Sequence, residues 1–290
     1  MELTEHNQEL YKIRHSLAHI LAQAVLEIQP DAELGFGPPI STGFYYDFRL
    51  SKPFSPEDLK DIEKRMKKII KSNQKFEQYE KSSDQTVDYL KNHNQPLKAE
   101  YAGELGEKFE NLSFYQNGPF TDMCEGPHVE STRKIPKGCF KLDSIAGSYW
   151  RGDSSQPMLM RIYGLAFESK DKLTQFIEER RLAQERDHRK LGRELDLYVM
   201  DDEVGQGLPL WLPNGTVLRE ELESLAKDME FQQGYQRVAT PHITKESLYY
   251  TSGHLPYYKD TMYAPIEIDG DNYYLKPMNC PHHHKIFDSR

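Results

Sequence analysis

Two pairs of side chains with metal-binding or acid–base chemistry stand out in this sequence of 290 residues. The first pair is His15 and His19, and the second, about a hundred residues later, is Cys124 and His128. The members of each pair are four positions apart. Imidazole and thiolate groups bind zinc, and a cysteine beside a histidine can also act as a nucleophile with its base. Two such pairs can close on one small pocket, as a metal site, a catalytic site or a hydrogen-bonding clamp.

The histidine pair is expected on a helix of roughly residues 8–29. Apolar residues recur there at helical spacing. At about 100° per residue, His15 and His19 point away from the apolar stripe, so we expect them off the face that packs into the core. The plain alternative is a pair of solvated helix residues. The stripe consists of Leu10, Ile13, Leu17, Ile20, Leu21, Ala24 and Ile28.

Cys124 is expected at a turn between extended segments, because Gly126 and Pro127 follow it. The plain alternative for this pair is a half-buried cysteine beside a histidine of the turn. A further set of ligand-type residues lies near the end of the sequence. Neighbouring residues rarely bind one ion with good geometry, so such a site would need ligands from elsewhere. This set consists of Cys280, His282, His283 and His284.

Composition predicts a soluble globular protein, with 29% charged and 37% apolar residues. The length is sufficient for two domains with cores of their own. No run of about 18 apolar residues predicts a membrane helix, and the first residues do not resemble a secretory signal. Three cysteines make no disulfide framework, which favours a reduced, cytoplasmic location. The net charge of −9 argues against nucleic-acid binding through bulk charge but leaves room for a local basic groove.

One basic run, residues 64–71, belongs to an expected helix of residues 56–72. Ser55 is the expected N-cap and Pro56 the first helical residue. A solvated helix face is the favoured interpretation of the run. The apolar side of this helix consists of Ile62, Met66, Ile69 and Ile70.

The order of elements predicts an α+β fold with mixed helices and an antiparallel sheet. A charged, mostly polar helix from about Lys170 to Leu191 is expected to bridge two domains, with Gly192 as its breaker and a boundary near 185–195. Further on we expect a helix at 216–233 and a strand at 235–240. Before the bridge, we expect a short helix at 84–92 and extended segments near 43–47, 74–80, 112–116, 138–145 and 158–166.

Several motifs, in sequence order, resemble the threonyl-tRNA synthetase family of class II aminoacyl-tRNA synthetases. The segment 187–198 is similar to the family's junction into its catalytic domain, and Pro-Met-Asn-Cys-Pro at 277–281 to its catalytic zinc segment. The motifs similar to its editing domain are His-Ser-Leu-Ala-His (15–19), Gly-Phe-Tyr-Tyr-Asp (43–47), Thr-Asp-Met-Cys-Glu-Gly-Pro-His (121–128), Ala-Gly-Ser-Tyr-Trp-Arg-Gly-Asp (146–153) and Arg-Ile-Tyr-Gly (161–164).

The resemblance implies an editing domain at 1–168, a linker helix at 169–192 and, at 193–290, the start of an antiparallel-sheet catalytic domain. Such an enzyme attaches threonine to tRNA(Thr) using ATP with Mg²⁺, and hydrolyses serine wrongly attached to that tRNA. Threonine and serine differ by one methyl group, worth only about 1–3 kcal/mol in binding, so a second, hydrolytic site is needed.

The resemblance also assigns roles to single residues. Asp122 would recognise the seryl amino group or hydroxyl, and Tyr46 and Lys98 would lie beside the tRNA end and the attacking water. Cys280 would be one of three protein ligands of a Zn²⁺ ion in the catalytic domain, the other two being expected beyond residue 290. The element at 216–241 would form a homodimer. The pocket itself would be lined by His15, His19, Cys124 and His128.

Two questions remain open at this point: whether the pocket holds a metal, and whether the chain is part of a ligase. The family's pocket works through ordered water without a metal, whereas related stand-alone alanyl-tRNA deacylases use zinc there. We expect the chain to lack the family's usual ubiquitin-like first domain and to stop within the catalytic domain. It would then be an incomplete ligase that retains editing. It could instead be a stand-alone deacylase or a tRNA-binding fragment without activity. The helix at 216–233 and the Met-Asn-Cys-Pro segment favour the ligase, because a pure deacylase needs neither.

Overall fold

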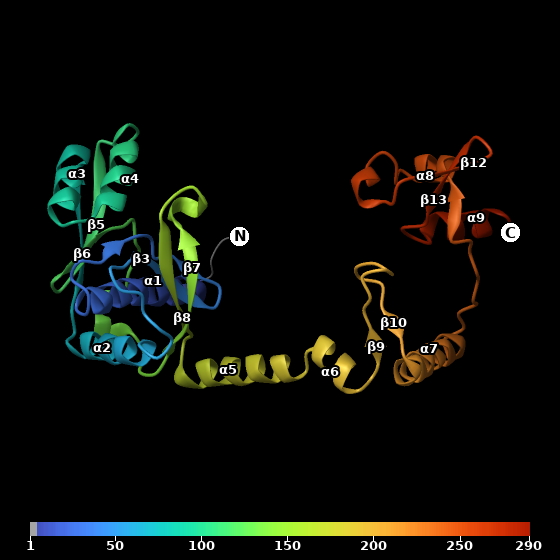
Figure 1. Ribbon diagram of the computed structural model, residues 1–290, viewed down its shortest axis with the longest axis horizontal. Helices are drawn as coiled ribbons and strands as arrows, with labels where there is room; N and C mark the ends of the chain where they lie inside the picture. Colours follow the sequence, from blue (N-terminus) through green and yellow to red (C-terminus); the bar gives the residue numbers. More distant parts are fainter. Residues whose placement is uncertain (1–4) are drawn as a thin grey trace. The chain divides into compact units, whose positions relative to one another are not determined.

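The computed structural model describes residues 5–290 and divides into two compact units, one ending at Asp187 and the other beginning at His188 (Figure 1). Both units mix helices with antiparallel sheets, as the sequence predicts. In the described part of the chain, no helix combines the length and apolar character needed to cross a membrane.

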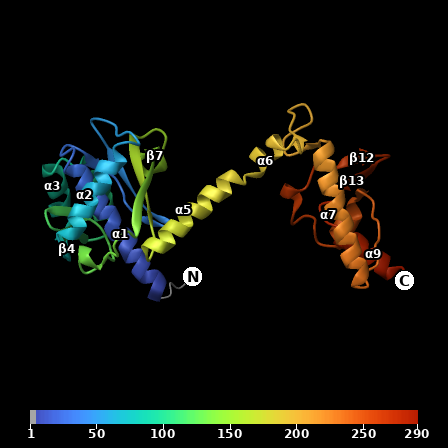
Figure 2. The same cartoon turned by 90° about the horizontal axis from the view of Figure 1, so that it is seen from below.

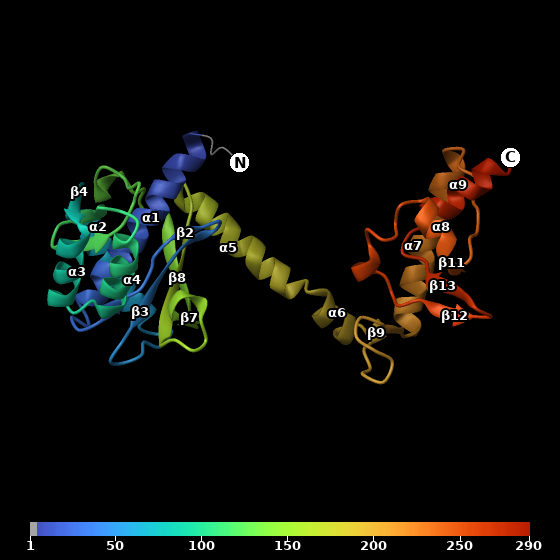
Figure 3. The same cartoon turned by 90° about the horizontal axis from the view of Figure 1, so that it is seen from above.

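The main sheet of the first unit is antiparallel, in the order β1–β3–β8–β7, with β2 paired to β3 (Figure 3). Alternate residues of β3 turn inward: Phe44, Tyr46 and Phe48 are fully buried. Gly37 lies against the Tyr46 ring, where an added Cβ would come within 2.1 Å of a ring carbon, so only glycine fits there. The strands are β1 (Glu33–Leu34), β2 (Pro39–Ile40), β3 (Gly43–Arg49), β7 (Phe140–Tyr149) and β8 (Met158–Ala166), with η2 (Trp150–Gly152) between the last two.

Helix α1 (Glu5–Leu26) packs against β3 and against α2 (Leu59–Lys71), which lies beside it in Figure 2. Every residue from His15 to Val25 is buried. The expectation that His15 and His19 lie off the packed face is therefore wrong. The apolar stripe faces the main core, and other elements of the unit, β6 among them, cover the histidine side as well.

Helix α2 begins later than the sequence indicates. Ser55 is not its N-cap, because the Ser55 amide and hydroxyl both donate to Asp58 Oδ2, at 2.7 and 2.9 Å, and this closes a turn before the helix. The helix then starts at Leu59.

A smaller sheet, in the order β4–β5–β6, carries two short helices on top. A capping box between Ser82 and Gln85 starts the first of these helices. The second was not foreseen, and it contains Lys98. The elements are β4 (Phe76–Ser82), α3 (Ser83–Asn92), α4 (Pro96–Gly106), β5 (Asn111–Asn117), β6 (Phe120–Met123) and η1 (Thr132–Lys134).

The polar bridge is two helices, α5 (Lys170–Glu185) and α6 (His188–Glu194), and not one. Gly192 does not break a helix: it lies buried inside α6, where an added Cβ would come within 2.4 Å of the Tyr198 ring. The division between the two units falls between these helices.

In the second unit the long helix α7 (Pro213–Gln232) ends before Gly234, which has a φ of +83°. The strand expected at 235–240 is absent, because that segment joins no ladder, and the next strand starts only at Ile243. The other elements are β9 (Tyr198–Val199), β10 (Leu210–Trp211), β11 (Ile243–Lys245), α8 (Glu246–Thr251), η3 (Lys259–Thr261), β12 (Ile266–Ile268), β13 (Asp271–Leu275) and α9 (Cys280–Asp288).

Candidate functional site

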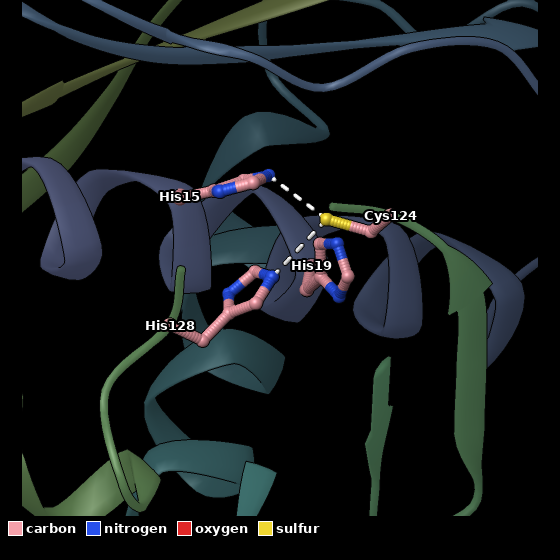
Figure 4. Close-up of side chains that lie close together, drawn as sticks. All are labelled: His15, His19, Cys124 and His128. Carbon is pink, nitrogen blue, oxygen red and sulfur yellow. Dashed lines mark hydrogen bonds between the residues drawn. The ribbon is translucent and has the colours of Figure 1, made fainter. Parts of the chain in front are cut away.

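The two pairs singled out in the sequence meet in the first unit (Figure 4). Helix α1 presents His15 and His19 one turn apart. Strand β6 delivers Cys124, whose amide donates to the Ser113 carbonyl at 3.0 Å. Gly126 then turns the chain with a φ of +75°, packed so closely on Tyr115 that a Cβ would come within 2.4 Å of the Tyr115 hydroxyl oxygen, and this turn brings His128 back to the cluster.

Cys124 is the centre of the contacts. Its Sγ lies 3.2 Å from His15 Nε2 and 3.3 Å from His128 Nε2, and it accepts the Gly126 amide hydrogen at 3.2 Å. One ligand-type atom from each of the four residues lies within 4.8 Å of the others.

Ser16 is a member of the site that the sequence reasoning missed. Its Oγ is fully buried, accepts the Val129 amide hydrogen at 3.1 Å and lies 3.1 Å from His128 Nδ1. It therefore joins α1 to the loop that carries His128. Its position between the two histidines of the His-Ser-Leu-Ala-His motif was the sequence signal that could have found it.

Aromatic rings enclose the cluster. Phe76 stacks on His128 with centroids 4.9 Å apart and an interplanar angle of 6°, Tyr115 meets the same imidazole edge-on at 4.5 Å, and Phe120 meets His19 at 5.6 Å. These rings exclude water, so the charged forms of the enclosed groups lose their hydration.

The ionisation of the four side chains follows from this enclosure. Burial lowers the pKa of His15 to about 4 and that of His128 to about 2, and it holds the pKa of His19 well below its usual range. Burial also raises the pKa of the Cys124 thiol to about 12. At neutral pH the metal-free site therefore holds three neutral imidazoles and a protonated thiol.

A second buried group lies beside the first. Lys98 from α4 donates to Asp122 Oδ1 and, at 3.0 Å, to the Tyr46 hydroxyl, which in turn donates to Asp122 Oδ2 at 2.5 Å. Lys98 and Asp122 are only 2% and 4% exposed, so each charge depends on the other for compensation. Burial, followed by the charge of Asp122, raises the pKa of Tyr46 well above its usual range, so Tyr46 stays a hydrogen-bond donor.

His19 connects the two groups, because its Nε2 lies 4.0 Å from Asp122 Oδ2. All seven residues that the sequence places in the editing pocket therefore come together. Cys280 does not join them: it is the exposed first residue of α9 in the second unit. Among the described residues, the cluster of His15, His19, Cys124 and His128 is the sole group of three or more ligand-type side chains close enough to hold a metal. Cys280 therefore has no partner ligands among the described residues.

The donor set of this cluster fits zinc. Three imidazoles and a thiolate are typical zinc ligands, and tetrahedral bonds of about 2.0–2.3 Å place ligand atoms roughly 3.3–3.6 Å apart. The two S···N distances of 3.2 and 3.3 Å lie at or just below that spacing, and all four ligand atoms lie within 4.8 Å of one another. His19 Nδ1 is buried without a hydrogen-bond partner.

The segment that carries three residues of the site is similar to a known family. The family "Threonyl and Alanyl tRNA synthetase second additional domain" matches residues 112–163, the segment that contains Asp122, Cys124 and His128. This segment of the first unit is thus similar to a domain that the family's description assigns to two kinds of aminoacyl-tRNA synthetase.

Nearly the whole chain is similar to one of these kinds. The threonine–tRNA ligase of Dehalococcoides mccartyi (strain ATCC BAA-2100) is 48% identical over 282 residues, which are 97% of this chain and 47% of that enzyme. The threonine–tRNA ligase of Deinococcus radiodurans is 48% identical over 284 residues, covering 96% of this chain and 43% of that enzyme. The RNA-binding domain of threonyl-tRNA synthetase from Cryptosporidium parvum Iowa II matches 36% of this chain and 26% of that chain, with 36% identity and a TM-score of 0.35.

Over nearly its whole length the chain is similar to the threonine–tRNA ligases, and it spans about half the length of the curated relatives it matches.

Proposed function

We propose that the first unit is a hydrolytic editing domain that removes serine from mischarged tRNA(Thr). It would serve a threonine–tRNA ligase that attaches threonine to tRNA(Thr) with ATP and Mg²⁺. One observation carries the proposal: seven chemically active side chains from distant parts of the sequence converge on one enclosed site.

The reaction is hydrolysis of an ester, in which water attacks the seryl carbonyl carbon and the ribose oxygen leaves. Neutral imidazoles can accept a hydrogen bond from a water molecule and hold it against the ester. His15 and His19 are suited to this, since burial keeps both uncharged at neutral pH. Their low basicity favours positioning of the water over full proton removal.

Lys98 would stabilise the negative charge that develops on the carbonyl oxygen. Its ammonium is held in place by Asp122 and Tyr46 before any substrate arrives, and a preorganised charge in a water-poor site is effective in transition-state stabilisation. Each carboxylate oxygen of Asp122 can accept more than one hydrogen bond, so Asp122 could also bind the seryl ammonium or hydroxyl.

The chemistry of the donor set supports a second form of the same proposal, in which the site holds zinc through His15, His19, Cys124 and His128. Zinc would require the Cys124 thiolate. Because four protein ligands fill a tetrahedral site, water or the ester carbonyl would have to bind as a fifth ligand or replace one of them for the ion to polarise it as a Lewis acid. Zinc analysis of the purified chain and of Cys124→Ser distinguishes the forms. Stoichiometric zinc that disappears in the variant supports the metal form, and its absence at full hydrolytic activity supports the water form.

Hydrolysis by the purified chain is the direct test. Wild type should release serine from seryl-tRNA(Thr) and leave threonyl-tRNA(Thr) largely intact, and His19→Asn should slow the release at least tenfold. Lys12→Gln is a matched control on the same helix, because Lys12 is partly exposed and paired with Glu9 outside the site. An intact seryl ester after incubation with folded wild type would exclude autonomous hydrolysis. Binding of that tRNA without hydrolysis would favour a role in tRNA binding alone.

For the second unit, we propose the start of a class II catalytic domain that forms a homodimer through the 216–241 region. Helix α7 supports this, since it exposes five apolar side chains that are between 52% and 61% accessible. Sedimentation of wild type against Leu222→Asp should show a dimer that the charge dissociates. A monomer in both samples would contradict it. The five exposed apolar side chains of α7 are Val217, Leu218, Leu222, Leu225 and Met229.

Cys280 would contribute one ligand to a zinc ion whose other ligands lie outside the described residues.

A further inference from the structure

Helix α2 carries a stripe of positive charge that the editing chemistry does not use. Lys60, Lys64, Lys68 and Lys71 are all exposed. At 100° per residue they fall within a narrow arc of the helix surface, opposite the side that packs into the core. That buried side consists of Leu59, Ile62, Met66 and Ile69. We call the four lysines the lysine stripe.

The members of the stripe differ from the other cations of the helix. Arg65 pairs with Asp61 at 3.1 Å, and Lys67 pairs with Glu63. Within the described chain, none of the four stripe lysines forms an ion pair or a side-chain hydrogen bond. Like charges spaced four residues apart on a helix destabilise it, so an unpaired run of this kind costs stability in the free protein. A bound polyanion would reverse that cost.

The C-terminal end of the stripe leads towards the site. After Lys71 the chain reaches Lys75, which is exposed and whose backbone bridges to Ser131, and then Phe76, whose ring stacks on His128. The end of α2 is also tied to the loop that follows His128, since Thr132 Oγ1 donates to the Ile70 carbonyl at 3.0 Å. These contacts therefore join the end of α2 to the loop that carries His128.

We propose that the lysine stripe of α2 binds the phosphate backbone of the tRNA whose 3′ end enters the site at His15 and His128. The proposal rests on the proposed editing function for the identity of the RNA. In a chain of net charge −9, overall charge repels RNA, so a local row of unpaired lysines must supply the attraction. Each phosphate contact releases condensed counterions, which makes the affinity fall steeply with salt.

The test compares two fourfold variants of the full chain, each of which lowers the net charge by four. Lys60→Gln, Lys64→Gln, Lys68→Gln and Lys71→Gln together remove the stripe. The control removes four ion-paired lysines, and both proteins are checked for folding by circular dichroism. The probe is a labelled, uncharged tRNA(Thr) transcript titrated at several salt concentrations. The control substitutions are Lys12→Gln, Lys190→Gln, Lys227→Gln and Lys285→Gln.

Removal of the stripe should weaken tRNA binding at least tenfold at 0.1 M salt. It should also flatten the plot of log affinity against log salt by about 0.7–0.9 for each phosphate that the variant no longer neutralises. The control should change the slope far less. An unchanged affinity and slope in the stripe variant, or an equal effect in the control, would overturn the proposal, as would a wild type that binds no RNA. Wild-type binding with the expected slope change, but without hydrolysis of seryl-tRNA, would support the stripe while the editing function fails.

Discussion

His19 Nε2 lies 4.0 Å from Asp122 Oδ2, and the two side chains are only 2% and 4% exposed. This contact joins the histidine–cysteine cluster on α1 to the buried group of Tyr46, Lys98 and Asp122. The imidazole is neutral in this setting because burial holds its pKa well below the usual range. The site is therefore one continuous polar structure inside an aromatic shell. A substitution in one group should alter the contacts of the other.

The Lys98–Asp122 pair offers the sharpest test of that structure. Lys98→Met and Asp122→Asn should each destabilise the first unit by about 3–5 kcal/mol, because each leaves a buried partner uncompensated. The double variant should lose much less than the sum of the two. Urea unfolding of all four proteins gives the coupling energy as a double-mutant cycle. Additive losses would show that the two side chains do not depend on each other.

Stability should fall as the pH drops below about 6.5. The pKa of His15 is about 4 in the folded chain and about 6.5 when unfolded, so between these values the unfolded state binds the extra proton. The free energy of unfolding therefore decreases as the pH falls, by about 2 kcal/mol at pH 5 relative to neutral pH for His15 alone. His19 and His128, whose pKa values are also lowered, act in the same direction.

The free energy of unfolding, measured from pH 7.5 down to pH 5, checks this. His15→Gln removes one titrating group and should make the dependence shallower than in wild type. The variant is also expected to lose some stability at all pH values, because His15 is buried. Parallel pH profiles for the two proteins would mean that His15 titrates normally in the folded state.

The three cysteines should differ in reactivity. Burial raises the pKa values of Cys124 and Cys139 to about 12, so in the metal-free chain almost no thiolate is present at pH 8. Cys280 is exposed at the start of α9. Iodoacetamide should modify Cys280 at least tenfold faster than the other two, as read by peptide mass mapping after treatment with a chelator. Denatured protein, in which all three should react alike, is the control; equal rates in the folded chain would contradict the buried site.

Ser16 should set the protonation of the His128 ring. Its Oγ accepts the Val129 amide hydrogen, so its own hydrogen is free to point at His128 Nδ1, which leaves the ring proton on Nε2, facing Cys124. Nitrogen NMR of the metal-free chain should show the Nε2–H tautomer in wild type and a mixture in Ser16→Ala. Hydrolysis of seryl-tRNA should fall about 10- to 100-fold in kcat, as for other residues that orient a functional histidine. A wild-type ring protonated on Nδ1 would refute this role.

Local sequence patterns determined much of the architecture. The α+β class, the helix carrying His15 and His19, and the β8 strand at 158–166 follow from periodicity and turn residues, which depend on near neighbours. The motifs around His15, Tyr46 and Cys124 selected residues that the structure brings together, although Ser16 was missed. The resemblance to threonyl-tRNA synthetases, carried by those motifs, is confirmed by relatives 48% identical over nearly the whole chain.

Only the tertiary structure decided the environment of those residues. A helical stripe shows which side of α1 is apolar, but it does not show that other elements cover the opposite side and bury His15 and His19 as well. The strand expected at 235–240 has no ladder partner, and strand formation depends on that partner and not on the segment itself. The buried pair of Lys98 and Asp122 likewise depends on how α4 docks beside β6. Burial and long-range pairing come from segments distant in the sequence, and these set the pKa values and contacts on which the chemistry depends.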